Sequence, residues 1–362
     1  MKNLLKNIRR ILIIQLGDIG DVVWATPTFW AVKDAFPEAQ LSILLREGFG
    51  RLLEADPSLS RIVEVRRYKG SLLKRILAQI RFIVHFRREG FDLAIDLRSD
   101  ERGAYMAYAS GAPIRVSLYY QDAPFLRNRL FTHLVSPPPQ QEKVRGAAEQ
   151  SLCLVRALGI KTVGTIPRLY VKENAHRKVE GLLQEKGIDE NIKWLTLNPF
   201  SRWPYKEWGQ EKWVEIVDWL WSQYQIATVI VGAEEEREKA ERLTKQISGK
   251  AFNLSGETFL DELAALLKLS ILHIGVDSAA PHIAAAVGTP TITIFGPSNW
   301  EDWAPVGATH RVILPNQDCV PCFKKGCDGQ GWSRCLAELT VGAVKESIRE
   351  ALESLGGSTG SP

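Results

Sequence analysis

The segment Ile274-Gly-Val-Asp-Ser-Ala-Ala-Pro-His-Ile-Ala-Ala-Ala-Val-Gly-Thr-Pro-Thr-Ile-Thr-Ile-Phe-Gly-Pro297 decides the fold of this chain. Its pattern predicts a short apolar strand, then a helix capped by Ser278, then a buried strand over Thr291–Phe295. Pro281 falls in the first helical turn, where a missing backbone N–H costs little, and Gly288 is suited to end the helix. The segment is therefore typical of a strand–helix–strand unit in a parallel α/β sheet.

The first turn of this predicted helix is a candidate anion-binding site. Its free backbone N–H groups would point to the carboxyl edge of the sheet, where phosphate groups bind. Asp277 and His282 flank the turn, which Ser278 and Ala279 begin. We expect these residues to contact an anionic, nucleotide-linked ligand. The alternative for His282 is a packing residue on the helix.

Length and composition indicate a globular protein of two α/β domains. The chain has 362 residues, 45% of them hydrophobic, and a formal net charge of only +4, so nothing in its overall charge indicates nucleic acid as a partner. Strand patterns alternate with helical patterns in both halves. The predicted strands include Ile11–Leu16, Leu41–Leu44, Ile62–Val65, Leu93–Leu97, Trp194–Asn198 and Thr228–Val231.

The expected fold is a pair of Rossmann-like domains, each a doubly wound parallel sheet, with both carboxyl edges facing a cleft. Residues 111–140 show no regular pattern. The predicted divisions are an N-terminal domain over 1–165, a connection over 166–192, a C-terminal domain over 193–338, a final helix over 339–355 and a disordered tail over 356–362.

The stretch 66–88 combines basic residues with a helical apolar pattern. It contains eight lysine and arginine residues and no acidic residue. The apolar residues at helical spacing are Leu72, Leu73, Ile76, Ile80 and Ile83. Two interpretations are open: a core-packed helix with a solvated basic face, or a helix that contacts anionic lipid headgroups or a phosphorylated acceptor. The residues expected to make such contacts are Arg66, Arg67, Lys74, Arg75 and Arg81.

The N-terminal stretch resembles a signal peptide only superficially. Its apolar run, Ile11-Leu-Ile-Ile14, is short and Gly17-Asp18 follows at once, so a first β-strand is the better prediction. No segment has the apolar length of a membrane-spanning helix. We expect a cytoplasmic protein that rests peripherally on the inner face of a membrane.

The loop Gly17-Asp-Ile-Gly-Asp21 follows the first predicted strand. It is an incomplete dinucleotide fingerprint, because Val23 stands where a third glycine is expected and two carboxylates would repel a pyrophosphate. An acid here suits proton abstraction from a sugar hydroxyl, and the nearby helix N-terminus is expected to favour the ionised form of Asp21. The alternatives are that Asp21 is only an N-cap and Asp18 only a turn residue.

Two loops of the second domain carry candidate donor-binding residues. Ser201 and Arg202 can donate to phosphate oxygens, and Lys206 adds a mobile positive charge. Such cations would neutralise a diphosphate leaving group without a metal. Glu234 could bind ribose or sugar hydroxyls. The alternatives are a surface loop with inward tryptophans and, for Glu234, an acidic helix start.

Four of the five cysteines fall close together, with the spacing C-x2-C-x4-C-x7-C. This spacing suits Zn²⁺ or an iron–sulfur cluster; the alternative is that the cluster only packs against the cleft, and the spacing alone does not decide. The four are Cys319, Cys322, Cys327 and Cys335.

These motifs together resemble glycosyltransferase family 9, the ADP-heptose:lipopolysaccharide heptosyltransferases. The resemblance covers nearly the whole chain in order, and the Cys-rich and Trp-rich segments look most similar to the heptosyltransferase III-like subgroup. The motifs that carry it are Gly20-Asp-Val22 with Thr26-Pro27, Lys206-Glu-Trp208, Gly232-Ala-Glu234, Gly275-Val-Asp-Ser278 with His282, and Phe295-Gly-Pro297.

The resemblance implies a GT-B fold and an inverting transfer that needs neither metal nor cofactor. It implies an acceptor, phosphorylated lipopolysaccharide core, on the N-terminal domain, ADP-heptose on the C-terminal domain, and a place at the inner membrane. Asp21 would be the general base, Lys206 would hold the diphosphate and Glu234 the nucleotide ribose. The residues lining the donor sugar and diphosphate would be Asp277, Ser278, Ala279 and His282.

One departure concerns the donor. Many relatives have Thr and Gly where this chain has Ser278 and Ala279, which leaves donor identity more open than donor class. The alternatives are a family-9 transferase that uses another nucleotide sugar or a protein acceptor, a sugar-nucleotide epimerase, and a non-catalytic membrane-associated binding module.

Overall fold

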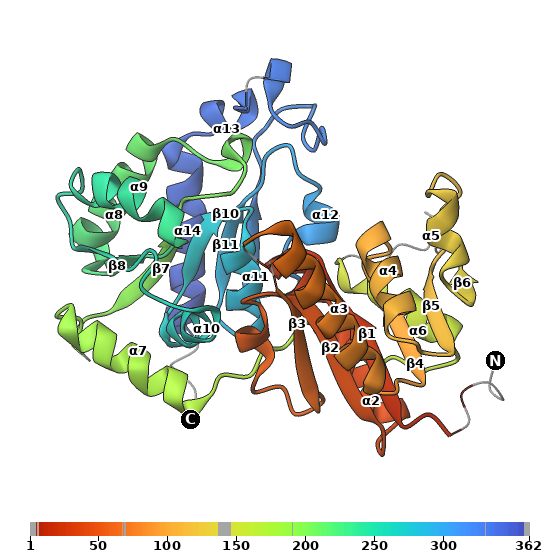
Figure 1. Ribbon diagram of the computed structural model, residues 1–362. Helices are drawn as coiled ribbons and strands as arrows, with labels where there is room; N and C mark the ends of the chain where they lie inside the picture. The colour runs from red at the N-terminus through yellow and green to blue at the C-terminus, as the bar shows by residue number, and fades with distance from the viewer. Residues whose placement is uncertain are drawn as a thin grey trace. The chain divides into compact units, whose positions relative to one another are not determined.

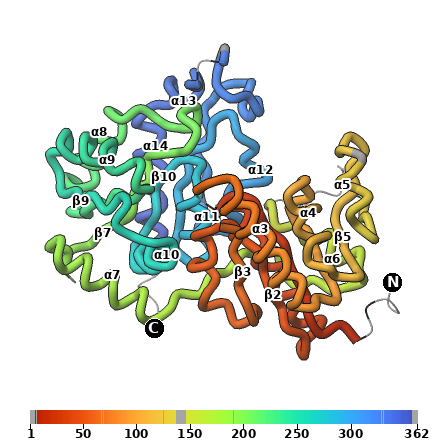
Figure 2. Tube along the Cα trace, viewed as in Figure 1, coloured from red at the N-terminus to blue at the C-terminus, as the bar shows by residue number. Residues whose placement is uncertain are grey.

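The computed structural model describes residues 5, 7–66, 68, 70–136, 146–189, 191–329 and 331–357. The chain divides into two compact units, Met1–Tyr170 and Val171–Pro362. Each unit is built on a six-stranded sheet flanked by helices, which Figure 1 shows as ribbons and Figure 2 as a continuous trace. The predicted α/β fold with two Rossmann-like domains is confirmed.

The sheet of the N-terminal unit is entirely parallel, with the strand order β3-β2-β1-β4-β5-β6. This is the order of doubly wound dinucleotide-binding folds, in which the loops after β1 and β4 meet at the carboxyl edge. The central strands are completely buried runs of aliphatic residues, as expected for a sheet covered on both faces. The strands are β1 (Arg10–Ile14), β2 (Gln40–Arg46), β3 (Arg61–Val65), β4 (Leu93–Asp96), β5 (Ile114–Leu118) and β6 (His133–Val135).

Helices pack on both faces of this sheet. Phe86 of α3 packs with α4 in one apolar cluster, while α2 packs against α6. The segment after β1 forms two helices that meet at Ala25, with Pro27 at the start of the second. The helices are α1 (Ile19–Trp24), α2 (Thr26–Ala35), η1 (Gly50–Leu53), α3 (Leu72–Arg88), α4 (Glu101–Ala109), α5 (Phe125–Arg129) and α6 (Ala148–Ala157).

The C-terminal unit repeats the same parallel order, β9-β8-β7-β10-β11-β12. Along β8, Ile230 packs on one face of the sheet while Val229 and Val231 pack on the other, as the strand period of two requires. The strands are β7 (Trp194–Asn198), β8 (Ala227–Ile230), β9 (Ala251–Asn253), β10 (His273–Val276), β11 (Thr291–Ile294) and β12 (His310–Ile313).

One face of this second sheet is covered by α8 and α14, and the other by α7 and α10. Trp208 and Trp213 meet edge to face at 4.8 Å in the first layer, which accounts for two of the many tryptophans as core residues. The helices are α7 (Glu173–Glu185), η3 (Pro204–Lys206), α8 (Gln210–Tyr224), η4 (Glu234–Glu236), α9 (Arg237–Thr244), α10 (Leu260–Leu269), α11 (Ala279–Ala286), α12 (Trp300–Trp303), η5 (Cys327–Gly329), α13 (Arg334–Glu338) and α14 (Val341–Gly357).

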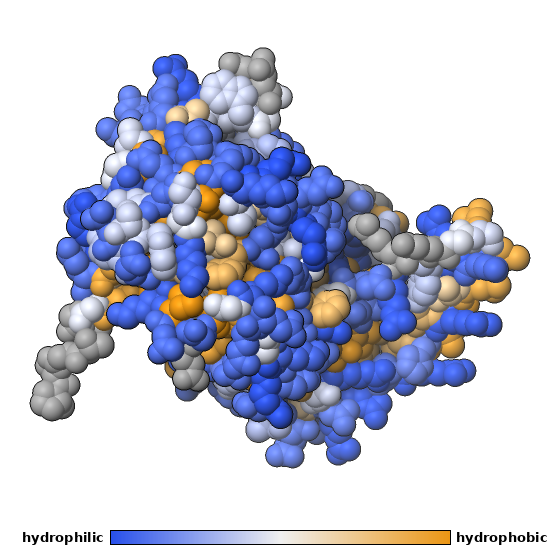
Figure 3. Space-filling view, turned by 90° about the vertical axis from the view of Figure 1, so that its left-hand side faces the viewer, coloured by the Kyte–Doolittle hydropathy of each residue, from blue (hydrophilic) through white to orange (hydrophobic). Residues whose placement is uncertain are grey.

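Exposed apolar residues are concentrated on one helix. Hydrophilic side chains cover most of the face drawn in Figure 3, and hydrophobic ones gather in patches between them. On α3, however, the apolar residues Leu72, Leu73 and Ile76 are exposed. A core-packed helix is therefore the wrong interpretation for most of α3, since Phe86 is its only buried residue among those described. No helix in the described ranges is long and apolar enough to span a bilayer.

Candidate active site

The loop between β1 and α1 holds Asp21 in a fixed position. Asp18 is the N-cap of α1 and Asp21 its third residue, and the backbone N–H of Asp18 donates to Oδ2 of Asp21 at 2.7 Å. This is the reciprocal arrangement of a capping box. Gly17 is required here, because a Cβ at that position would collide with the Asp21 carboxylate. Asp18 and not Asp21 is therefore the N-cap, and the capping contact leaves Oδ1 of Asp21 available for a second contact.

The ionisation of Asp21 differs from the expectation. The side chain is only 12% exposed, and this burial raises its pKa, while Arg98 and the Asp18 N–H act in the opposite direction. Desolvation thus outweighs the effect of the helix N-terminus, which was expected to favour the ionised form. A raised pKa makes the ionised carboxylate a stronger base toward a hydroxyl proton.

Two arginines that the sequence analysis did not single out flank this loop. Arg98, which follows β4, donates from Nη1 to Oδ1 of Asp21 at 3.0 Å. Arg46, the last residue of β2, donates to Oδ1 of Asp18 at 2.8 Å and to the backbone oxygen of Leu16. Because β2 and β4 are the two neighbours of β1, the sheet places one arginine on each side of the carboxylate pair.

The turn that carries Arg98 is held by a buried carboxylate. Asp96, at the end of β4, is fully buried, and its Oδ1 accepts the backbone N–H of Arg98 at 3.2 Å. Burial raises the pKa of Asp96 to about 7, with Asp100 adding to the effect and Arg127 opposing it. Gly103 is needed beside it, because a Cβ there would overlap the Asp96 carboxylate.

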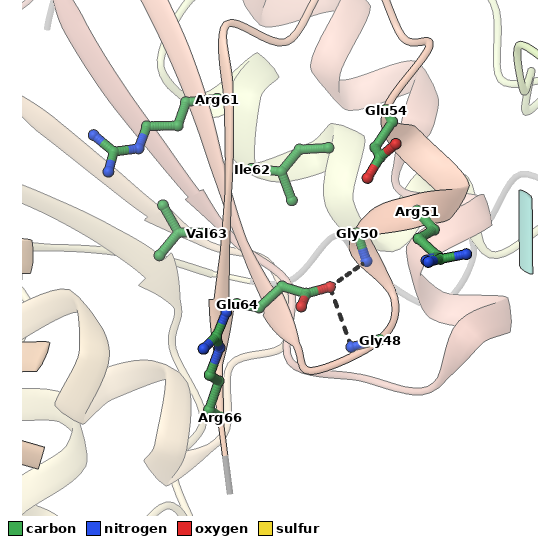
Figure 4. A pocket seen from close by; sticks show the side chains of 9 residues that line it. All are labelled: Gly48, Gly50, Arg51, Glu54, Arg61, Ile62, Val63, Glu64 and Arg66. Carbon is green, nitrogen blue, oxygen red and sulfur yellow. Dashed lines mark hydrogen bonds between the residues drawn. The ribbon is translucent and has the colours of Figure 1, made fainter. Parts of the chain in front are cut away.

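Arg66, one of the predicted acceptor contacts, lines a cavity of about 440 Å³ beside β3. Figure 4 shows Ile62 and Glu64 on one side of this strand and Arg61 on the other, with Glu64 accepting two backbone N–H bonds from the loop after β2. Arg51 and Arg61 also line the cavity, as do Glu54 and Glu64, so the lining carries one net positive charge.

The other predicted basic residues lie on or near α3. Lys74, Arg75 and Arg81 are exposed along this helix, and Arg66 is exposed at its approach. Arg67 lies outside the described residues.

In the C-terminal unit, the predicted donor-binding residues cluster at the carboxyl edge of the sheet. The Lys206 ammonium, which follows β7, donates to Oδ2 of Asp277 at 2.6 Å. The Ser201 hydroxyl donates to the backbone oxygen of Asp277 at 3.3 Å. The loops after β7 and β10 therefore come together, as expected for adjacent strands, and Asp277 sets the position of Lys206.

The start of α11 lies beside this cluster. Ser278 is its N-cap and Ala279 its first residue, as predicted, and Pro281 stands in the first turn. The Ser278 hydroxyl has no hydrogen-bond partner among the described residues. That leaves it and the first backbone N–H groups of the helix as donors for an anionic ligand.

His282 is buried on α11, and burial lowers its pKa to about 4. Asp277 raises that pKa and Lys206 lowers it, which places His282 in the same cluster. A neutral imidazole can offer one N–H to a diphosphate but no positive charge at neutral pH. His273, on β10, is also buried, with its pKa lowered to about 3, and it bonds to Thr196 within the core.

Glu234 stands where the sequence analysis placed it, after β8. It pairs with Arg237 at 3.2 Å, and it packs so closely on Gly256 that a Cβ there would overlap its carboxylate. Gly256 also has φ +73, a backbone conformation that favours glycine. The turn after β9 therefore needs glycine both for its backbone conformation and for the space that Glu234 occupies. Arg202 is exposed on the loop after β7.

All five cysteines are free thiols. Cys335 is buried, which raises its pKa to about 11, and the neighbouring thiols of Cys319, Cys322 and Cys327 add to the effect. The four therefore gather in one region. Within the described ranges, no group of three or more His, Cys, Asp or Glu side chains is arranged to hold a metal ion.

A protein-family model and a curated relative both match this chain. The family model for glycosyltransferase family 9 (heptosyltransferase) matches residues 79–333. Lipopolysaccharide heptosyltransferase 3 of Escherichia coli K12 is 26% identical over 295 residues, which cover 79% of this chain and 82% of that protein.

Solved structures share the fold. A family 9 glycosyl transferase from Veillonella parvula superposes with a TM-score of 0.79 at 22% identity, covering 96% of this chain and 97% of that one. The ADP-heptose lipopolysaccharide heptosyltransferase II of E. coli gives a TM-score of 0.76 at 19% identity, covering 95% and 99%. The two-domain architecture of this chain is thus the GT-B fold.

Proposed function

This chain belongs to glycosyltransferase family 9 and is a glycosyltransferase, and from that premise we propose that it transfers heptose from ADP-heptose to the inner core of lipopolysaccharide. The observation that carries the proposal is the cluster of Lys206, Asp277 and His282 at the start of α11. It combines a positioned cation with free helix N–H groups, which are the features that a sugar-diphosphate requires.

The proposed reaction is a single displacement with inversion. Asp21 takes the proton of an acceptor hydroxyl, whose oxygen attacks the anomeric carbon of the heptose. The bond from that carbon to the diphosphate breaks, and ADP departs with the electron pair. Lys206, Arg202 and the N–H groups at Ala279 stabilise the departing charge, so the protein itself supplies the positive charge that a metal would otherwise provide.

Glu234 and Ser201 complete the proposed donor site. The Glu234 carboxylate, 68% exposed, would accept hydroxyl groups of the ribose, and Ser201 would fix the loop that presents Lys206. Ser278 would donate to the diphosphate. The likeness to E. coli lipopolysaccharide heptosyltransferase 3 supports heptose as the transferred sugar and the III-like subgroup.

The proposed acceptor is a phosphorylated core oligosaccharide at the inner face of the inner membrane. Arg66, with Arg51 and Arg61 in the cavity beside β3, offers a site for an acceptor phosphate. Lys74, Arg75 and Arg81 extend the positive charge along α3. Reversing the charge of Arg75 and Arg81 should weaken binding to an anionic acceptor, and more so at low salt.

The test is ADP release by the purified protein given ADP-heptose and a truncated lipopolysaccharide core, with a chelator present. Release that requires both substrates would support the proposed donor, acceptor class and metal-independent chemistry. Release with another nucleotide sugar, or with a protein acceptor, would indicate a family-9 transferase with a different donor or acceptor. No release with any donor that binds would contradict the proposal.

A further inference from the structure

Among the helices in the described part of the chain, α3 carries the most exposed large hydrophobic residues. It spans 17 residues, Leu72–Arg88, and only Phe86 is buried. Single exposed hydrophobic residues are normal on a protein surface, but seven on one helix indicate an interaction site. Their exposed fractions are Leu72 70%, Leu73 67%, Ile76 42%, Leu77 48%, Ile80 50%, Ile83 38% and Val84 44%.

These seven residues share one side of the helix. At about 100° per residue they all fall within an arc of about 140°. Phe82 and Phe86 lie outside that arc and pack into the core of the N-terminal unit, where their rings stack at 5.4 Å. The helix thus has two separate apolar faces, one fixed to its own domain and one turned outward.

The charge beside the outward face has one sign. Among residues 66–88 there is no acidic side chain. Lys74, Arg81 and Arg88 border the apolar arc within about 60° of its edge, and all three are exposed. An apolar arc with basic side chains along one edge, on a helix without acidic residues, is the pattern of helices that lie in the interface of anionic membranes.

We propose that α3 anchors the protein to an anionic bilayer by laying its outward face, Leu72 to Val84, among the upper acyl chains. At 1.5 Å per residue the helix is about 25 Å long, so it would lie in the membrane plane. The basic border then reaches anionic headgroups, worth roughly a fivefold gain in binding per charge at low salt. This deepens the membrane contact of the proposed function and does not depend on the sugar chemistry.

The experiment is co-sedimentation of the full chain with vesicles of phosphatidylcholine alone or with one quarter phosphatidylglycerol, at low and high salt. We expect binding to the anionic vesicles at low salt and a weaker, persistent fraction at high salt. The persistent fraction reports apolar insertion, because screening removes the electrostatic attraction.

Variants separate the two contributions. Leu73→Ser and Ile80→Ser, at the centre of the outward face, should each weaken vesicle binding roughly tenfold and abolish the salt-resistant fraction. Arg81→Gln should weaken binding at low salt only. The matched control is Val163→Ser, which changes a residue that is 93% exposed elsewhere and should leave vesicle binding unchanged. All variants alter exposed positions, so their thermal unfolding midpoints should equal that of the wild type.

Three outcomes would overturn the proposal. The first is no binding to anionic vesicles. The second is binding that salt abolishes but Leu73→Ser and Ile80→Ser leave unchanged, which would show attraction without insertion. The third is a dimer in solution that Leu73→Ser converts to a monomer, which would show that a second copy covers this face. Each result is independent of sugar transfer, so failure of the anchor and failure of the proposed enzyme activity are distinguishable.

Discussion

The guanidinium of Arg98 donates from Nη1 to Oδ1 of Asp21 at 3.0 Å, joining residues that are 77 positions apart in the sequence. The pair forms because β1 and β4 are neighbours, so that the segments after both strands meet at one edge of the sheet. Oδ2 of Asp21 is held by the Asp18 N–H. Both carboxylate oxygens are therefore oriented by the N-terminal unit itself.

Removing Arg98 should shift the pH dependence of transfer. Asp21 acts as a base only when ionised; burial raises its pKa, and Arg98 opposes that rise. In Arg98→Gln the pKa of Asp21 should rise further, so a smaller fraction is ionised at a given pH. We expect kcat/KM to fall at acidic and neutral pH and to recover as pH increases, in a steady-state pH profile.

Arg46→Gln is the matched control, because Arg46 is also near Asp21 but pairs with Asp18. Arg46→Gln should shift the rise of kcat/KM with pH less than Arg98→Gln does. An equal loss of activity at every pH in Arg98→Gln would show that Arg98 supports the loop without tuning the base.

Asp21→Asn should strongly slow transfer without harming the fold. Loss of a general base typically costs 10²–10⁴-fold in rate. The pKa of Asp21 is higher in the folded than in the unfolded chain, so the ionised carboxylate costs stability at neutral pH. The asparagine variant should therefore unfold at the same or a higher temperature, measured by calorimetry, and should still bind ADP. Turnover near the wild-type rate would exclude Asp21 as the base.

The sequence predicted elements best where apolar runs are long and buried. The predicted bounds of Trp194–Asn198 are those of β7. In contrast, β5 and β6 fall within the stretch 111–140 that shows no regular pattern. They were missed because β6 has only three residues, all partly buried, and because Arg115 and Ser117 interrupt the apolar residues of β5.

For the site, the sequence identified residues within a motif but not the partners that other strands supply. Lys206 and Asp277 were each predicted from their own loops, and the structure joins them. Arg46 and Arg98 carry no local signal, because their roles depend on the strand order β2-β1-β4. Knowledge of that order would have placed both at the carboxyl edge beside Asp21.

Lys206→Met should impair the donor side of the reaction. Loss of one positioned donor to a developing negative charge costs roughly 10²–10³-fold in kcat. We expect that loss together with weaker ADP binding, measured by calorimetric titration, because Asp277 would also be left without its cation. Lys245→Met, at an exposed i,i+4 pair on the surface, is the control and should change neither value. Unchanged ADP affinity in Lys206→Met would remove Lys206 from the diphosphate site.

Asp96 should make stability fall with pH near neutrality. Its folded pKa of about 7 lies above the ordinary value of 3.8, so between these values the folded state holds a proton that the unfolded state has lost. Unfolding free energy therefore decreases as pH rises through this window, by a few kcal/mol in total. His273 and His282 act in the opposite sense below pH 6.5, since their folded pKa values are lowered.

The variant Asp96→Asn isolates this effect, because asparagine keeps an acceptor for the Arg98 N–H and does not titrate. The difference in unfolding free energy between variant and wild type, from urea titrations at pH 5, 6, 7 and 8, should grow in favour of the variant as pH rises. A difference that is constant with pH would mean that Asp96 is ionised in the folded protein throughout, with Arg127 as its counter-charge.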